Sequence, residues 1–117
     1  MPNLIMEYTD SVEERVNVPK LLEDLHLLTL KSGLFAKEDV KSRAIRCHDW
    51  LLGEEQDSQD FIHITLEMLS GRTEEQKRAL LEPLMAVLQQ EASQIRSLSI
   101  NMRDMDKQTF MKTTNEL

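Results

Sequence analysis

The cationic side chains of this sequence fall at places where an anion could bind. Arg72 directly precedes Thr73, and Gln76 three residues later completes a capping box that signals a helix start. The exposed N–H groups and the positive dipole end of a helix start favour an anion, and an arginine adds a full charge. Taken alone, Arg72 is more commonly interpreted as a surface residue at the end of a loop.

Two further cations lie on a segment whose pattern alternates as in a strand. Lys41 and Arg43 share one face of the segment Val40 to Trp50, because successive side chains of a strand point to opposite faces. Charged residues on an edge strand are usually solvated and guard the edge against aggregation. Lys41 and, second to it, Arg43 are therefore candidates for binding an anion, with simple solvation as the alternative.

The metal-ligating side chains form no comparable arrangement. The three histidines, His26, His48 and His63, lack the spacing of a metal site. Because His63 belongs to an apolar strand pattern, we expect a packed and hydrogen-bonded ring there. The sequence therefore predicts no metal site.

Nucleophilic and acid–base groups are equally dispersed. The run Cys47-His48-Asp49 cannot form a triad, because neighbours on a strand face opposite sides. We expect Cys47 to be a small buried residue. The remaining acidic candidates are scattered and suggest no general-acid pair: Asp57, Asp60 and Glu67.

Hydrophobic patterning predicts two successive strand–helix–strand units. The first contains a buried strand at Asn3 to Tyr8, a helix that opens at Pro19 and stops at Gly33, and a half-exposed strand at Val40 to Trp50. The second contains a strand at Phe61 to Leu69, a helix that begins at the Thr73 cap and includes Pro83, and a short strand at Leu98 to Met102.

These two units, residues 2–50 and 60–103, predict the fold class. Each should place its two strands parallel, with the helix as a right-handed crossover. Together they predict an α/β (α+β) fold, with a four-stranded mixed sheet and two helices on one face. The 117 residues fit a single domain, residues 1–117, with a polar tail at 104–117 that could extend over a neighbour. The other sheet face would be bare, which favours a homo-oligomer.

Composition limits the possible partners. The formal net charge of −7 argues against general binding to nucleic acid or to anionic membranes. A small anionic substrate stays possible, because local cations outweigh a distant surface charge that salt screens. The single Cys47 and the lack of a signal-peptide or membrane-spanning pattern predict a cytoplasmic protein.

Three stretches, in this order and spacing, resemble one known family. They are the initial Met1-Pro2 before a strand, Ser32-Gly33-Leu34-Phe35 followed by Val40-Lys41-Ser42-Arg43, and Phe61-Ile62-His63-Ile64-Thr65-Leu66 leading to Ser70-Gly71-Arg72-Thr73. Together they resemble the 5-carboxymethyl-2-hydroxymuconate delta-isomerase family of the tautomerase superfamily. The resemblance extends from Pro2 to about Met102.

The resemblance implies a tautomerase-like protomer assembled as a homotrimer, with active sites near subunit boundaries. It implies a cytoplasmic isomerase of aromatic-compound breakdown that uses no metal or cofactor. An amino-terminal proline moves a proton on an unsaturated 2-hydroxy or 2-oxo dicarboxylate, similar to 5-carboxymethyl-2-hydroxymuconate. Carried over, Pro2 is the general base and Arg72 holds a carboxylate or enolate, while Lys41 and Arg43 contribute to substrate binding.

The chemistry of an amino-terminal proline fits this expectation. An α-amino group has a pKa of about 7.7–8.0, and burial and adjacent cations lower it towards the range that suits a general base. Met1 must be removed, since otherwise the Pro2 nitrogen is an amide without a basic lone pair. Small second residues such as proline permit that removal.

Other interpretations stay open at this point. Lys41 stands where members of the family carry arginine, and a lysine lacks the planar fork that grips a carboxylate at two points, so the substrate is less certain than the reaction type. A non-catalytic oligomer on the same scaffold is the main alternative function, and retention of Met1 would favour it. A dehalogenase-like hydratase would need a further acidic group to activate water, and no convincing one is evident.

Overall fold

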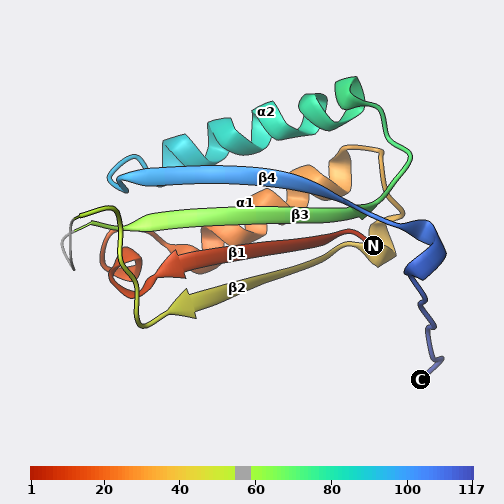
Figure 1. Cartoon of the computed structure of the whole chain (residues 1–117), viewed down its shortest axis with the longest axis horizontal. Helices are drawn as coiled ribbons and strands as arrows, with labels where there is room; N and C mark the ends of the chain where they lie inside the picture. The colour runs from red at the N-terminus through yellow and green to blue at the C-terminus, as the bar shows by residue number, and fades with distance from the viewer. Residues whose placement is uncertain (55–58) are drawn as a thin grey trace.

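The computed structural model describes residues 1–54 and 59–117, and Asp57 lies outside this described part of the chain. Its main elements, in chain order, are β1 (Asn3–Thr9), α1 (Val18–Lys31), β2 (Lys41–Cys47), β3 (Phe61–Leu69), α2 (Glu74–Glu91) and β4 (Ser97–Met105) (Figure 1). Three short 3-10 helices accompany them: η1 (Asp10–Glu14), η2 (Lys37–Asp39) and η3 (Lys107–Thr109).

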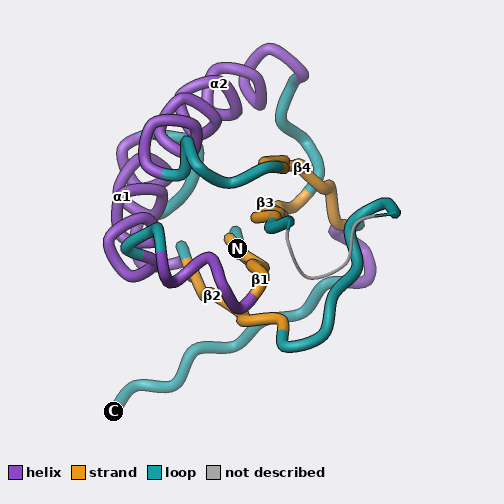
Figure 2. Tube along the Cα trace, turned by 90° about the vertical axis from the view of Figure 1, so that its left-hand side faces the viewer, coloured by secondary structure: helices purple, strands orange, loops and turns teal. Residues whose placement is uncertain are grey.

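The strands form one mixed sheet in the order β2-β1-β3-β4. Strands β1 and β2 are parallel, as are β3 and β4, whereas the central pair β1 and β3 is antiparallel. Both helices cover the same face of this sheet, as Figure 2 shows. The predicted pair of strand–helix–strand units and the four-stranded mixed sheet are therefore confirmed.

The core lies between the two central strands and the two helices. In β3, alternate residues from Ile62 to Met68 are fully buried, and Phe61, His63 and Thr65 face the other side, as the alternating pattern predicts. Each large apolar side chain buried in this way contributes about 1.5–3 kcal/mol relative to exposure. The helices complete the core with fully buried leucines: Leu21, Leu25, Leu84 and Leu88.

Local capping signals define both helices. The side chain of Asn17 accepts from the Lys20 amide at the start of α1. At the start of α2, Thr73 and Gln76 form the predicted capping box, and the helix continues through Pro83. Among the described residues, neither helix combines the length and the apolarity that crossing a membrane requires.

Two strand ends differ from the sequence-based expectation. Strand β4 extends from Ser97 to Met105 instead of Leu98 to Met102, because it pairs with β3 along that strand's whole length. Strand β2 ends at Cys47 instead of Trp50, because the strand it pairs with, β1, ends opposite it at Thr9. Pairing between strands, and not hydropathy, sets both ends.

A buried carboxylate joins the far end of β1 to the start of β3. Asp60 is 4% exposed and accepts hydrogen bonds of 2.6 Å from both the Thr9 and the Ser11 hydroxyls. The Arg15 guanidinium also pairs with it. The sequence offered Asp60 as a scattered acidic candidate. In the structure its carboxylate instead stabilises the turn after β1.

Removing this carboxylate should destabilise the fold. We expect Asp60→Ala to lower the free energy of unfolding by about 2–3 kcal/mol, because three donors lose their acceptor and Thr9 is fully buried. Urea titration measures the change. Asp10→Ala, which breaks exposed pairs with Arg46 and His48, is the matched control and should cost at most about 1 kcal/mol. Equal losses in both variants would contradict this account.

Candidate active site at the amino terminus

The start of the chain lies beside the start of β2. Pro2 is buried, and its carbonyl accepts a hydrogen bond of 3.1 Å from the Lys41 amide. The next residue, Asn3, is opposite Lys41 in the parallel pairing. The exposed Lys41 side chain therefore begins next to the first residues of β1.

Arg72 is held in one position by main-chain carbonyls. Its Nη1 donates to the Leu69 carbonyl and its Nη2 to the Leu34 carbonyl, each at 2.9 Å. The guanidinium carbon lies 4.8 Å from the centre of the Phe35 ring, a cation–π distance. Because a guanidinium has five N–H donors, this half-buried group keeps donors for an anion while its position is fixed.

The amine at the chain start lies among several charges. Burial lowers the pKa of the Met1 amine below its ordinary value of 8.0. Lys112, Lys41 and Arg72 lower this pKa further, whereas Asp39 raises it. The structure thus places Lys41 and Arg72, both predicted site residues, around the chain start that contains Pro2.

Arg43 lies further from this cluster. It is opposite Ile5 in the β1–β2 pairing, two residues beyond Lys41, which is about 6–7 Å along the strand. Its side chain is exposed. A substrate-binding role for Arg43 stays a prediction.

Sequence reasoning missed three residues of the cluster. Phe35 was part of a recognisable stretch, but its contact with Arg72 depends on the fold. Asp39 and Lys112 form an ion pair although 73 residues separate them. No local sequence pattern predicts an ion pair between residues so far apart in the chain. The sequence indicated only that the tail is polar.

The remaining candidates have structural contacts of their own. His63 is half-buried, and its Nδ1 lies 2.6 Å from the Ser99 hydroxyl, which confirms the expected hydrogen-bonded ring.

Cys47 is half-buried instead of buried, because it ends the outermost strand β2. Burial and the nearby Glu7 carboxylate raise the pKa of the Cys47 thiol. A raised pKa disfavours the reactive thiolate.

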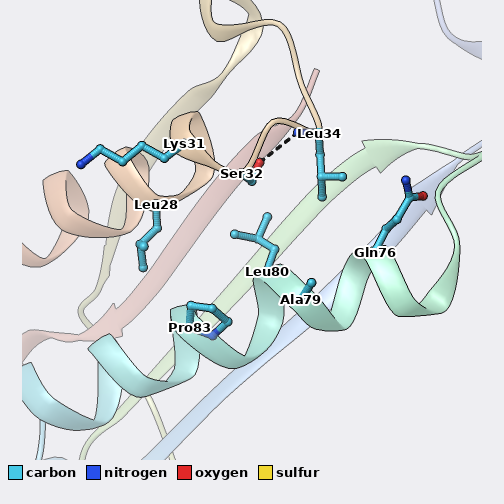
Figure 3. A pocket seen from close by; sticks show the side chains of 8 residues that line it. All are labelled: Leu28, Lys31, Ser32, Leu34, Gln76, Ala79, Leu80 and Pro83. Carbon is cyan, nitrogen blue, oxygen red and sulfur yellow. Dashed lines mark hydrogen bonds between the residues drawn. The ribbon is translucent and has the colours of Figure 1, made fainter.

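A cavity in the helical layer lies apart from this cluster. It has a volume of about 290 Å³ and opens between the last turn of α1 and the first turns of α2 (Figure 3). None of Pro2, Lys41 and Arg72 lines it. Its lining is mostly apolar: Leu28, Lys31, Ser32, Leu34, Gln76, Ala79, Leu80 and Pro83. Lys31 is the one charged residue among these, and the cavity does not include the chain start that the amine chemistry needs.

Comparison with known proteins decides the family. The family model described as 5-carboxymethyl-2-hydroxymuconate isomerase matches residues 2–116. The chain belongs to the 5-carboxymethyl-2-hydroxymuconate isomerase family. The family predicted from the sequence, within the tautomerase superfamily, is therefore confirmed. The prediction that the chain is an isomerase is also confirmed.

Individual relatives agree with this assignment. The 5-carboxymethyl-2-hydroxymuconate Delta-isomerase of Escherichia coli is 25% identical over 88 residues, which cover 75% of this chain and 70% of the relative. A 5-carboxymethyl-2-hydroxymuconate isomerase from Deinococcus radiodurans R1 superimposes with a TM-score of 0.87 at 30% identity, over 97% of this chain and 90% of that one. A fused 4-OT described as a symmetric trimer shares the fold with a TM-score of 0.70 at 13% identity, over 92% and 91% of the two chains.

Proposed function

We propose that this isomerase moves a proton between carbons of an unsaturated 2-hydroxy or 2-oxo dicarboxylate, similar to 5-carboxymethyl-2-hydroxymuconate. The Pro2 nitrogen, freed by removal of Met1, acts as the general base. The observation that supports this proposal most is the buried chain start surrounded by Lys41, Arg72 and Lys112. Such chemistry belongs to the breakdown of aromatic compounds, which we place in the cytoplasm.

The arrangement suits abstraction of a proton from carbon. A neutral imino nitrogen takes the proton, and negative charge develops on the enolate oxygen of the substrate. Arg72, already held by the carbonyls of Leu34 and Leu69, stabilises that charge without having to reorganise. The protonated nitrogen then returns its proton at another carbon, which completes the isomerisation.

The proposed base predicts a defined pH dependence. Burial and the nearby cations lower the pKa of the Met1 amine, and the same cations would lie near the Pro2 nitrogen, one residue away, once Met1 is removed. Since the neutral amine is the active form, kcat/KM should rise with pH through a midpoint below the ordinary pKa of an amino-terminal amine. High salt should screen the cations and move this midpoint upward. A midpoint that salt leaves unchanged would contradict an electrostatic origin.

The most direct test of the function is turnover across a panel of muconate-like acids, combined with intact-mass analysis. We expect proton exchange on a 2-hydroxy dicarboxylate by protein whose mass lacks Met1. Protein that retains Met1 and turns over none of the acids would instead favour a non-catalytic oligomer on this scaffold.

We also propose that the protein is a homotrimer. Its helices cover one sheet face only, so the other face presents the half-buried side chains of Ile5, Phe61 and His63 to a partner. The 4-OT relative with this fold is described as a symmetric trimer. Light scattering should therefore report three times the 13.6 kDa mass of one chain. A stable monomer at micromolar concentration would contradict a site shared between subunits.

A further inference from the structure

The tail after β4 passes close to the amino terminus. Strand β4 is tied to the loop before α2 by a 2.9 Å hydrogen bond from the Ser70 amide to the Met105 carbonyl. The Lys107 ammonium then lies so close to Gly71 that a Cβ there would be 3.1 Å from it. Further along, Lys112 pairs with Asp39, the residue that ends η2. Figure 1 shows the tail leaving from the end of the sheet at which the amino terminus lies.

This path adds a third cation to the site. Lys41 comes from β2, Arg72 from the β3–α2 loop and Lys112 from the tail, and Asp39 is the carboxylate within the same group of charges. Of the charges that shift the pKa of the amine most, three are positive and one is negative, although the whole chain carries −7. A local excess of this kind attracts an anion with more than one carboxylate.

Two of these cations, Arg72 and Lys112, differ in their freedom to move. Arg72 is confined by two carbonyls and the Phe35 ring, so it holds one fixed position. Lys112 has 31% of its side chain exposed and carries three donors on a flexible stem, of which Asp39 engages one. Lys112 can therefore bind a second anionic group while Asp39 keeps it near the amine.

We propose that Lys112 is a further substrate-binding residue, whose ammonium, positioned by Asp39, binds one carboxylate of a substrate that carries at least two. This inference rests on the proposed function of the amino-terminal site. It assigns the tail a part in the site, and it assigns to Asp39 the positioning of Lys112. The alternative is that Lys112 merely anchors the tail to the body of the protein.

Ligand binding tests this proposal without requiring turnover. Adipate, a saturated dicarboxylate, and hexanoate, its monocarboxylate counterpart, are titrated into the full-length protein by calorimetry. We expect adipate to bind more tightly than hexanoate, and Lys112→Met to weaken adipate binding about five- to tenfold with little effect on hexanoate. Lys112→Arg should keep most of the adipate affinity. Lys37→Met, which removes an exposed cation from η2, is the matched control and should change neither ligand.

A variant of Asp39 separates ligand binding from anchoring. Asp39→Asn removes the partner that positions Lys112 but keeps the charge of Lys112, so it should weaken adipate binding less than Lys112→Met does. If Lys112 only anchored the tail, both variants would break the same ion pair and change adipate affinity equally. That result, or unchanged adipate affinity in Lys112→Met, overturns the proposal.

The two proposals fail in different ways. If no muconate-like acid is turned over but adipate binding still depends on Lys112, the proposed reaction is wrong and the carboxylate site stands. If turnover depends on Pro2 but not on Lys112, the reaction stands and the contribution of the tail is wrong.

Discussion

Pro2→Ala is expected to lower kcat/KM for proton transfer on the substrate by about 10²–10⁴-fold, the usual contribution of a positioned general base. The proline ring fixes the direction of the nitrogen lone pair, whereas an alanine amine rotates and is more fully hydrated. Pro2 is buried and lies at one end of the sheet, where its carbonyl accepts a hydrogen bond from the Lys41 amide, so small changes there misplace the base. Steady-state kinetics on the best acid of the panel measure the loss.

Two controls accompany this variant. Its oligomeric mass should be that of the native protein, since alanine at this position removes no core side chain of the cluster around Leu4. Native protein fractions that retain Met1 should be inactive, because their Pro2 nitrogen is an amide. Full activity in Pro2→Ala, or in the fraction with Met1, would exclude Pro2 as the base.

Arg72→Ala is expected to have the second large effect, a drop in kcat of about 10²–10³-fold. The substitution removes the cation that we propose stabilises the developing enolate. It also removes two hydrogen bonds of 2.9 Å to the carbonyls of Leu34 and Leu69 and the contact with the Phe35 ring. Because these contacts tie the loop before β2 to the loop before α2, we also expect a loss of about 1–3 kcal/mol in the free energy of unfolding.

Two further variants separate charge from geometry at this position. Arg72→Lys keeps the positive charge but cannot bridge both carbonyls, so it should recover only part of the activity. Arg78→Ala removes an exposed arginine of α2 whose partner Glu82 is 3.7 Å away, and it should leave kcat and stability nearly unchanged. If Arg72→Lys were fully active, the fixed guanidinium geometry would be unimportant for catalysis.

Much of the fold could be predicted from local sequence patterns. The alternation over Phe61–Leu69 predicts which residues of β3 are buried, because side chains of a strand point to opposite faces in turn. The capping box at Thr73 and Gln76 predicts the start of α2, since both partners lie within one turn. From these elements the mixed four-stranded sheet with helices on one face follows, and it is the fold observed.

The site was predictable only in part. Pro2, Lys41 and Arg72 belong to stretches that resemble a known family, and the structure brings them together at one end of the sheet. Arg43 shares the strand and face of Lys41 but lies two residue pairs further along the strand from the amine. The alternating pattern of a strand predicts the face on which a side chain lies. Its distance from the amine depends on the register between β2 and β1, which the pattern does not predict.

Local patterns thus determined the elements, their buried faces and the family of this isomerase, because those properties depend on residues a few positions apart. The tertiary structure decided the lengths of β2 and β4, the hydrogen bonds that the Asp60 carboxylate accepts and the position of the tail. Lys112 reaches Asp39 across 73 residues of sequence. Contacts of this kind arise from strand pairing and chain path, and these are set only when distant segments pack together.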